Sequence, residues 1–182
     1  MTKRIVVAAL VACIAGFVWS SVAHMSPIGM LGIQTMSDSG EAAALAATKA
    51  ATADKNGFYM FPKAAMDGAP SPGPTGILVY QSQGSTGMAG MMPYVGAEFV
   101  LEFIETLIVA FLIAKSGVEG FTCRVAMASG IGAVAALATN GSYHIWYAFP
   151  LDYSVGMAII QFVQYTIAGL VLAKMLPKSA TT

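Results

Sequence analysis

Charged side chains are scarce in this chain of 182 residues, and neither sign predominates. Asp, Glu, Lys and Arg make up 10% of the residues, against about 25% in an ordinary soluble domain. Nine basic and nine acidic residues give a formal net charge of zero, so the chain lacks the positive excess with which proteins neutralise nucleic-acid phosphates. The composition therefore excludes an ordinary soluble domain and argues against a nucleic-acid partner.

Cysteines are few, and the familiar catalytic motifs are missing. Cys13 and Cys123 stand far apart in apolar surroundings, so they form neither a disulfide framework nor a paired metal knuckle. The chain has no Gly-x-Ser-x-Gly, no phosphate-binding loop and no His-Glu-x-x-His, the signatures of several large enzyme classes. We therefore expect no enzymatic activity and no cofactor.

Long apolar runs are what the chain does contain. Hydrophobic residues make up 57% of it and the mean hydropathy is +0.70. A bilayer admits only helices or closed barrels, and the runs lack the alternation of barrel strands, so we expect an all-α integral membrane protein. A spanning helix needs about 20 mostly apolar residues, and four segments meet this length: residues 5–24, 94–115, 122–141 and 154–175.

Basic residues at the ends of these spans predict the orientation. Four spans place six of them on one side of the membrane, and the positive-inside rule makes that side cytoplasmic. Both termini are then cytoplasmic, residues 25–93 are periplasmic, and the location is a bacterial inner membrane. The six residues are Lys3, Arg4, Lys115, Arg124, Lys174 and Lys178.

The first span also has features of a removable signal. Ser21-Val22-Ala23 before His24 resembles a signal-peptidase site, and the four residues that end at Cys13 imitate a lipobox. Because the sequence begins at Met1, we expect the helix to be retained as a membrane anchor.

The segment between the first two spans is too long for a structureless loop. Residues 39–55 are rich in Ala behind a Ser cap signal, which predicts one exposed helix. Residues 77–81 form a short strand-like run. We expect a small, partly ordered periplasmic cap.

Short motifs occur in a fixed order along most of the chain. In this order they resemble a family of small four-span bacterial inner-membrane proteins to which no activity is assigned. The resemblance implies four spans with a periplasmic cap between the first two, and it implies no cofactor and no catalytic residue. The motifs are Trp19, His24-Met25 with Pro27 and Gly29, Gly57-Phe58-Tyr59 with Phe61-Pro62, Gly73-Pro74-Thr75-Gly76, and Trp146-Tyr147-Ala148-Phe149-Pro150.

Three glutamates interrupt the second span. Glu98, Glu102 and Glu105 lie within about 60° of one another on a helical stripe. Ionisable groups inside a span cost about 2.5 to 3.5 kcal/mol each and normally face a bundle interior, a water cavity or a partner. The stripe predicts either a proton or cation path, or a carboxylate metal site, or protonated glutamates that hydrogen-bond to neighbouring spans, and we favour the last. The expected partners are Ser129, Asn140, Gln161 and Gln164.

The two histidines are the remaining candidate ligands. His24 and His144 lie at the predicted outer interface with several methionines, a set that could bind copper. No two ligands stand at a recognised spacing, and methionine is a common packing residue, so we predict no metal site. The candidate polar cluster consists of Glu98, Glu102, Glu105, His24, His144 and Asn140.

Residues 129–141 are rich in glycine and alanine, which predicts close helix packing. Two sets of small residues have suitable spacing: Gly130, Ala133, Ala136 and Leu137, or Gly132 with Ala136.

Two classes of function compete. We favour a non-catalytic structural or accessory membrane protein that acts in a homo-oligomer or beside a partner membrane subunit, because four spans without an inverted repeat do not resemble a secondary transporter. The alternative is a proton-conducting, cation-conducting or metal-handling protein that uses the three glutamates or the periplasmic His and Met side chains.

Overall fold

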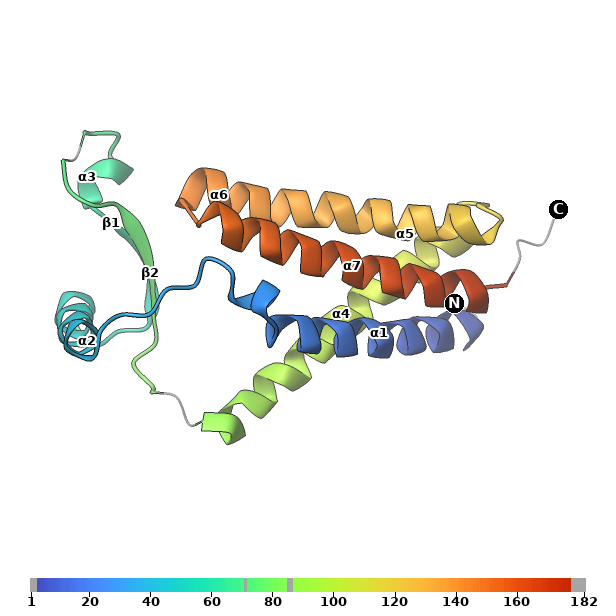
Figure 1. Ribbon diagram of the computed structural model, residues 1–182, viewed down its shortest axis with the longest axis horizontal. Helices are drawn as coiled ribbons and strands as arrows, with labels where there is room; N and C mark the ends of the chain where they lie inside the picture. The colour runs from blue at the N-terminus through green and yellow to red at the C-terminus, as the bar shows by residue number, and fades with distance from the viewer. Residues whose placement is uncertain (1–2, 71, 85–86, 178–182) are drawn as a thin grey trace.

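The computed structural model describes residues 3–70, 72–84 and 87–177 (Figure 1). The protein is mostly helical, with 73% of the described residues in helices. In the described part, three helices are long and apolar enough to cross a membrane: Lys3–His24, Phe121–Tyr147 and Leu151–Met175. These lengths and compositions are consistent with a membrane protein.

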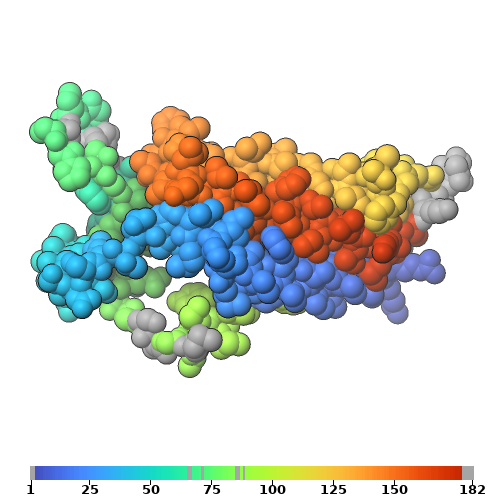
Figure 2. Space-filling view, viewed as in Figure 1, coloured from blue at the N-terminus to red at the C-terminus, as the bar shows by residue number. Residues whose placement is uncertain are grey.

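The bundle consists of four long helical rods: α1 Lys3–His24, α4 Gly87–Lys115, a continuous rod of α5 Phe121–Ala136, the π-helical turn η2 Leu137–Gly141 and α6 Ser142–Tyr147, and α7 Leu151–Met175. α7 packs closely along both α5 and α1, and Figure 2 shows α1 and α7 side by side on one face. α4 packs against α1 but crosses the bundle obliquely and has little contact with α5 and α7 (Figure 1). The half of α4 nearer the cap therefore stands apart from the other rods.

Each predicted span falls inside one of these rods, but the rods extend past the predicted ends. The third rod continues to Tyr147 because the polar residues after Ala138 stay helical as a π-turn. α7 begins directly after Pro150, which stands at the N-cap, where a missing N–H removes no helical hydrogen bond. The apolar runs therefore predict which helices exist, whereas local backbone geometry decides their ends.

Small residues bring α5 and α7 together. Ala128, Gly132 and Ala136 recur every four residues and are buried, so they share one helix face. A Cβ on Gly132 would lie against the Cβ of Tyr165 on α7 and 2.8 Å from its Cγ. Of the two predicted small-residue sets, Gly132 with Ala136 is therefore the one that packs. In the set that includes Gly130 and Leu137, both of those residues lie on the exposed side of the rod.

The half of the bundle nearer the termini has a dry core. Its members come from α1, α4, α5 and α7, and alanines predominate among them, which lets the helix backbones approach closely. The buried cluster contains Ile5, Ala8, Ala9, Ala12, Val109, Ala110, Ile113, Ala128, Ala168, Leu172 and Leu176.

Arg124 closes this end of the bundle although it is only 5% exposed. Its Nη1 donates to the Leu176 carbonyl (2.8 Å), its Nη2 to the Pro177 carbonyl (2.8 Å) and its Nε to the Val118 carbonyl (3.1 Å). A cation is favoured here by the negative end of the α7 dipole. The guanidinium thus ties the loop before α5 to the C-terminus of α7.

The segment between α1 and α4 forms a small cap at the opposite end of the bundle (Figure 1). It contains the 3₁₀ turn η1 Pro27–Met30, α2 Asp38–Thr52, β1 Gly57–Phe61, α3 Lys63–Met66 and β2 Gly76–Tyr80. The strands form an antiparallel hairpin that pairs Gly57 with Tyr80 and Phe61 with Gly76. α2 and β2 correspond to the predicted helix and strand-like run, whereas β1 was not predicted. The all-α expectation therefore holds for the bundle but is wrong for the cap.

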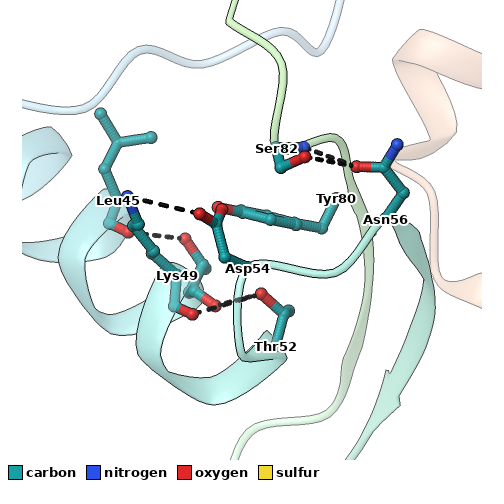
Figure 3. A network of polar contacts seen from close by, with 8 residues as sticks. Leu45, Lys49, Thr52, Asp54, Asn56, Tyr80 and Ser82 are labelled. Atoms are coloured by element: carbon teal, nitrogen blue, oxygen red, sulfur yellow. Dashed lines mark hydrogen bonds and ion pairs between the residues drawn. The ribbon is translucent and has the colours of Figure 1, made fainter.

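A polar network joins α2 to the hairpin (Figure 3). The Tyr80 hydroxyl donates to Asp54 Oδ1 (2.8 Å), and Lys49 Nζ lies 3.4 Å from Asp54 Oδ2. The backbone N–H and the hydroxyl of Ser82 both donate to Asn56 Oδ1 (2.7 and 3.0 Å). The hydrogen bond from Tyr80 holds the pKa of Asp54 below its ordinary value, with a smaller contribution from Lys49.

We expect Tyr80→Phe to raise the pKa of Asp54, because the substitution removes the donor that stabilises the carboxylate. An NMR pH titration of the Asp54 carboxyl in detergent micelles measures the change. Tyr59→Phe is the matched control, since the Tyr59 hydroxyl donates to the Lys55 carbonyl instead. An Asp54 pKa that stays the same in Tyr80→Phe, or rises equally in Tyr59→Phe, contradicts this account.

The same contact makes the cap sensitive to acid. Because the folded-state pKa of Asp54 is lowered, the contact stabilises the cap above the ordinary carboxyl pKa. That stabilisation is lost as the pH falls through the lowered value.

Candidate functional site

A polar cavity of about 250 Å³ lies among α1, α4, the π-turn and α7. Five of the six members of the candidate polar cluster line it: Glu98, Glu102, Glu105, His24 and Asn140. The oblique course of α4 opens this space, because the helix is in close contact with α1 but not with α7. Side chains that are far apart in the sequence thus surround one cavity.

Glu102 is the most deeply buried acid of the described residues. It is 3% exposed, and its Oε2 has no hydrogen-bond partner. Ser20 of α1 and Gln164 of α7 line the cavity with it. Leaving a buried acceptor unpaired costs about 1–3 kcal/mol, and more for a charged group. This oxygen therefore requires a proton, a water molecule or a cation from the cavity.

The other two glutamates differ in their surroundings. Glu98 is exposed on the diverging half of α4. Glu105 is partly buried, and the Tyr165 hydroxyl donates to its Oε2 (3.2 Å). Along α4, the carboxyl group of Glu98 is therefore exposed, that of Glu102 is buried, and that of Glu105 is partly buried and hydrogen-bonded.

The expected hydrogen-bond partners of the glutamates do not all lie at the cavity. Gln164, Gln161 and Asn140 line the cavity, whereas Ser129 pairs with Thr166 on α7 (2.9 Å). Sequence reasoning missed Tyr165, the residue that donates to Glu105. The available signal was a phenol within an apolar span, since a buried hydroxyl generally needs a hydrogen-bond partner.

The π-turn places Asn140 in the cavity wall. The Asn140 side chain is buried, and its Nδ2 donates to the Ala136 carbonyl (3.1 Å) and to Gln161 Oε1 (3.2 Å). π-turns inside α-helices are rare and occur frequently at functional sites. Thr139, the preceding residue of the turn, also lines the cavity. The turn thus supplies two polar residues to the wall and fixes one of them against α7.

The two histidines have different positions. His24 is exposed at the end of α1 and lines the cavity, and its Nδ1 lies 2.8 Å from the Ser20 carbonyl. A carbonyl only accepts, so Nδ1 carries a proton. His144 lies outside the cavity lining, with its Nδ1 2.8 Å from the Phe149 carbonyl. His144 is thus the one member of the predicted polar cluster that the structure does not bring to the cavity.

Three aromatic side chains also line the cavity, and its lining contains neither Lys nor Arg. Tyr143, Phe149 and Tyr153 all line the cavity. The rings of Tyr143 and Phe149 stack with centroids 5.4 Å apart, and Phe149 lies 5.6 Å from Tyr153. Neither Lys nor Arg is among the lining residues. No group of three His, Cys, Asp or Glu in the described part of the chain is arranged to hold a metal ion.

The cavity ends blindly in the bundle. Beyond it lies a small pocket of about 10 Å³, lined by Glu105, Thr106 and Tyr165 among others. Val109 of that pocket already belongs to the dry core, which fills the half of the bundle nearer the termini. The arrangement therefore accommodates a bound molecule but contains no continuous polar path through the described part of the bundle.

The chain matches no protein-family model, and neither a curated protein nor a solved structure is detectably similar to it.

Proposed function

We propose that this is a four-span membrane protein that binds a small cation in its carboxylate cavity. α4 is the additional span: its 29 residues extend about 43 Å at 1.5 Å per residue, enough to cross the hydrocarbon core at a tilt. Its acidic side chains line the cavity, which removes the main objection to placing this helix in a bilayer.

We place the cap in the periplasm of a bacterium and both termini in the cytoplasm. The helix ends that carry Lys3, Lys115, Arg124 and Lys174 lie at the end of the bundle away from the cap, and the positive-inside rule assigns that end to the cytoplasm. Lys178 lies outside the described residues. The cavity, whose walls lie in the half of the bundle nearer the cap, then opens toward the periplasm of the inner membrane.

Cysteine labelling tests this topology. We expect Lys49→Cys to react with a membrane-impermeant maleimide in intact cells, and Glu119→Cys to react only after the membrane is permeabilised. Both positions are exposed. Each variant is made with Cys123→Ser, because Cys123 is exposed whereas Cys13 is buried. Equal labelling of the two positions in intact cells contradicts the proposed orientation.

Glu102 carries the proposal of cation binding. Its unpartnered oxygen belongs to a buried side chain that lines a cavity with three carboxyl groups and neither Lys nor Arg. The reduced dielectric strengthens the attraction between a bound cation and the carboxylates, and the cation supplies the partner that Glu102 Oε2 lacks. The blind end favours binding over conduction, so we prefer a cation-binding protein to the conducting one.

Glu102→Gln is expected to remove cation-dependent stabilisation while preserving the shape of the side chain. Thermal unfolding in detergent is measured with sodium, potassium, ethylammonium and tetramethylammonium chlorides. A cation at 100 times its Kd stabilises the wild-type protein by about 2.7 kcal/mol, and the variant loses this effect. Glu119→Gln, in an exposed loop at the other end of the bundle, is the matched control. Absence of stabilisation by every salt, or equal stabilisation of Glu102→Gln, contradicts the proposal.

A structural or accessory role in an oligomer is favoured by one separate observation. Met127, Gly130, Ile131, Val134 and Ala135 line an open apolar groove of about 480 Å³ on α5, on the side of the rod that carries the exposed Val134. In a bilayer such a groove is covered by lipid or by another helix. Assembly with a second copy or a partner subunit therefore stays a prediction, and it is compatible with cation binding. Membership of the family that the motifs resemble also stays a prediction.

A further inference from the structure

The size of the cavity limits what its cation can be. About 250 Å³ corresponds to the share of about eight water molecules in the liquid, much more than a single dehydrated metal ion occupies. The described residues also contain no group of three His, Cys, Asp or Glu arranged around one point, as a protein zinc site requires. The cavity therefore fits a small organic molecule better than a bare ion.

The side chains that α7 contributes change in character along the cavity. Tyr153 lies near the start of the helix, Met157 follows one turn later, and Gln161 and Gln164 lie deeper. The 11 residue-to-residue steps from Tyr153 to Gln164 span about 16 Å along the helix at 1.5 Å per residue. The α7 side of the wall is thus aromatic near the cap and polar at depth, so it offers different chemistry to the two ends of one elongated ligand.

The polar end of the cavity is suited to an N–H donor. Glu102 Oε2 is unpartnered in a side chain that is 97% buried, since its exposed fraction is 3%, and the Gln164 side chain lines the same region. A primary ammonium carries three N–H donors and a positive charge, so it satisfies both the geometry and the charge of this site. A quaternary ammonium has no N–H to donate.

The aromatic end is suited to an apolar body. The ring of Phe149 contacts those of Tyr143 and Tyr153, and all three line the cavity. Aromatic faces attract both apolar groups and cations. An amine that lies with its nitrogen at Glu102 places its carbon skeleton against these rings.

We infer that the cavity binds a primary organic amine in its protonated form, with the ammonium at Glu102 and the carbon skeleton under the Tyr143–Phe149–Tyr153 rings. The inference rests on the proposed cation-binding function and narrows the ligand to one chemical class. It also accounts for the aromatic end, which a site for a proton or an inorganic cation does not require.

Trp19 provides a reporter for the test. Its Nε1 donates to the carbonyl of Ile160 (3.0 Å), and Ile160 lines the cavity. The chain has two tryptophans, so Trp146→Phe leaves Trp19 as the only one. Fluorescence of this variant in detergent is titrated with 2-phenylethylamine, which is protonated near pH 7, and with 2-phenylethanol, its neutral analogue of the same shape.

We expect saturable binding of 2-phenylethylamine at least about tenfold tighter than binding of 2-phenylethanol. Glu102→Gln in the same background is expected to abolish that difference. Phe149→Leu is expected to weaken the binding of 2-phenylethylamine more than the binding of ethylammonium, because only 2-phenylethylamine is long enough to reach the aromatic end. The Glu102→Gln and Phe149→Leu variants are used only if each unfolds, without ligand, at the same temperature as the Trp146→Phe parent. The comparison of the amine with the alcohol is made on the parent itself and requires neither variant.

The outcomes separate this inference from the proposed function. Equal affinity for amine and alcohol overturns the ammonium assignment. Stabilisation by sodium that depends on Glu102, without tighter binding of the amine than of the alcohol, overturns the amine assignment but leaves the cation site. Absence of any Glu102-dependent effect from all the cations overturns both.

Discussion

Replacement of Arg124 by methionine is expected to destabilise the folded protein by about 3 kcal/mol. Methionine keeps much of the apolar stem but loses three charge-assisted hydrogen bonds, each worth about 1.5–3 kcal/mol. Part of this loss is offset because burying the neutral methionine side chain costs less desolvation energy than burying a guanidinium. The carbonyls of Leu176 and Pro177 also lose the cation that caps the negative end of α7. Thermal or denaturant unfolding in detergent micelles measures the loss.

Arg4→Met is the matched control, because Arg4 is exposed near the start of α1 at the same end of the bundle. Its effect is expected to stay within about 0.5 kcal/mol. Arg124→Lys is expected to give an intermediate loss, since a lysine retains the charge but not the planar fork that reaches three carbonyls. Equal stability of Arg124→Met and Arg4→Met contradicts the role assigned to the buried guanidinium.

Gly132→Leu is expected to separate α5 from α7 and to destabilise the bundle by about 1–3 kcal/mol or more. The Cβ alone would contact Tyr165 at its Cβ and Cγ. These atoms are close to the α7 backbone and cannot move independently of it. Displacement of Tyr165 also disturbs its hydrogen bond to Glu105. The expected result is therefore a lower melting temperature together with weaker cation-dependent stabilisation.

Gly130→Leu makes the same chemical change two residues away. A Cβ on Gly130 would meet nothing within 4 Å, so the stability of the isolated protein is expected to be nearly unchanged. A loss equal to that of Gly132→Leu would mean that general helix propensity, rather than the α5–α7 contact, decides the effect.

The cavity depends on two departures from a regular bundle. α4 crosses obliquely, which leaves room beside Glu102, and the π-turn places Asn140 against Gln161. Close packing along a left-handed bundle would have brought α4 against α7 and filled this space. The polar interior is therefore a consequence of helix geometry as well as of residue type.

Sequence reasoning was most informative where the physical property is local. Apolar length is measured along the chain, so the positions of the helical rods follow from the order of the residues. The spacing of Glu98, Glu102 and Glu105 follows from helix periodicity, and the three side chains line the same cavity. The Ala-rich helix of the cap was predicted for the same reason from residue 39 onward, although its N-cap in the structure is Ser37.

Strand β1 illustrates the limit of this reasoning in the cap. Its five residues form a strand only because they pair with β2, which lies 19 positions further along the chain. Short apolar segments have no secondary structure preference strong enough to predict such pairing. The same holds for the aromatic contact between Phe58 and Tyr147, which joins the hairpin to α6.

By itself, the sequence determined that the chain is mostly helical, that its apolar helices are long enough for a bilayer, and that its acids share one helical stripe, because each of these properties depends on residues within a few turns of one another. Only the tertiary structure decided which acid has an unpartnered oxygen, that Tyr165 rather than Ser129 binds Glu105, that His144 stays outside the cavity, and that Gly132 rather than Gly130 packs on α7. These outcomes depend on the crossing angles of helices and on the π-turn, which arise from contacts between distant segments and have no counterpart in local residue spacing.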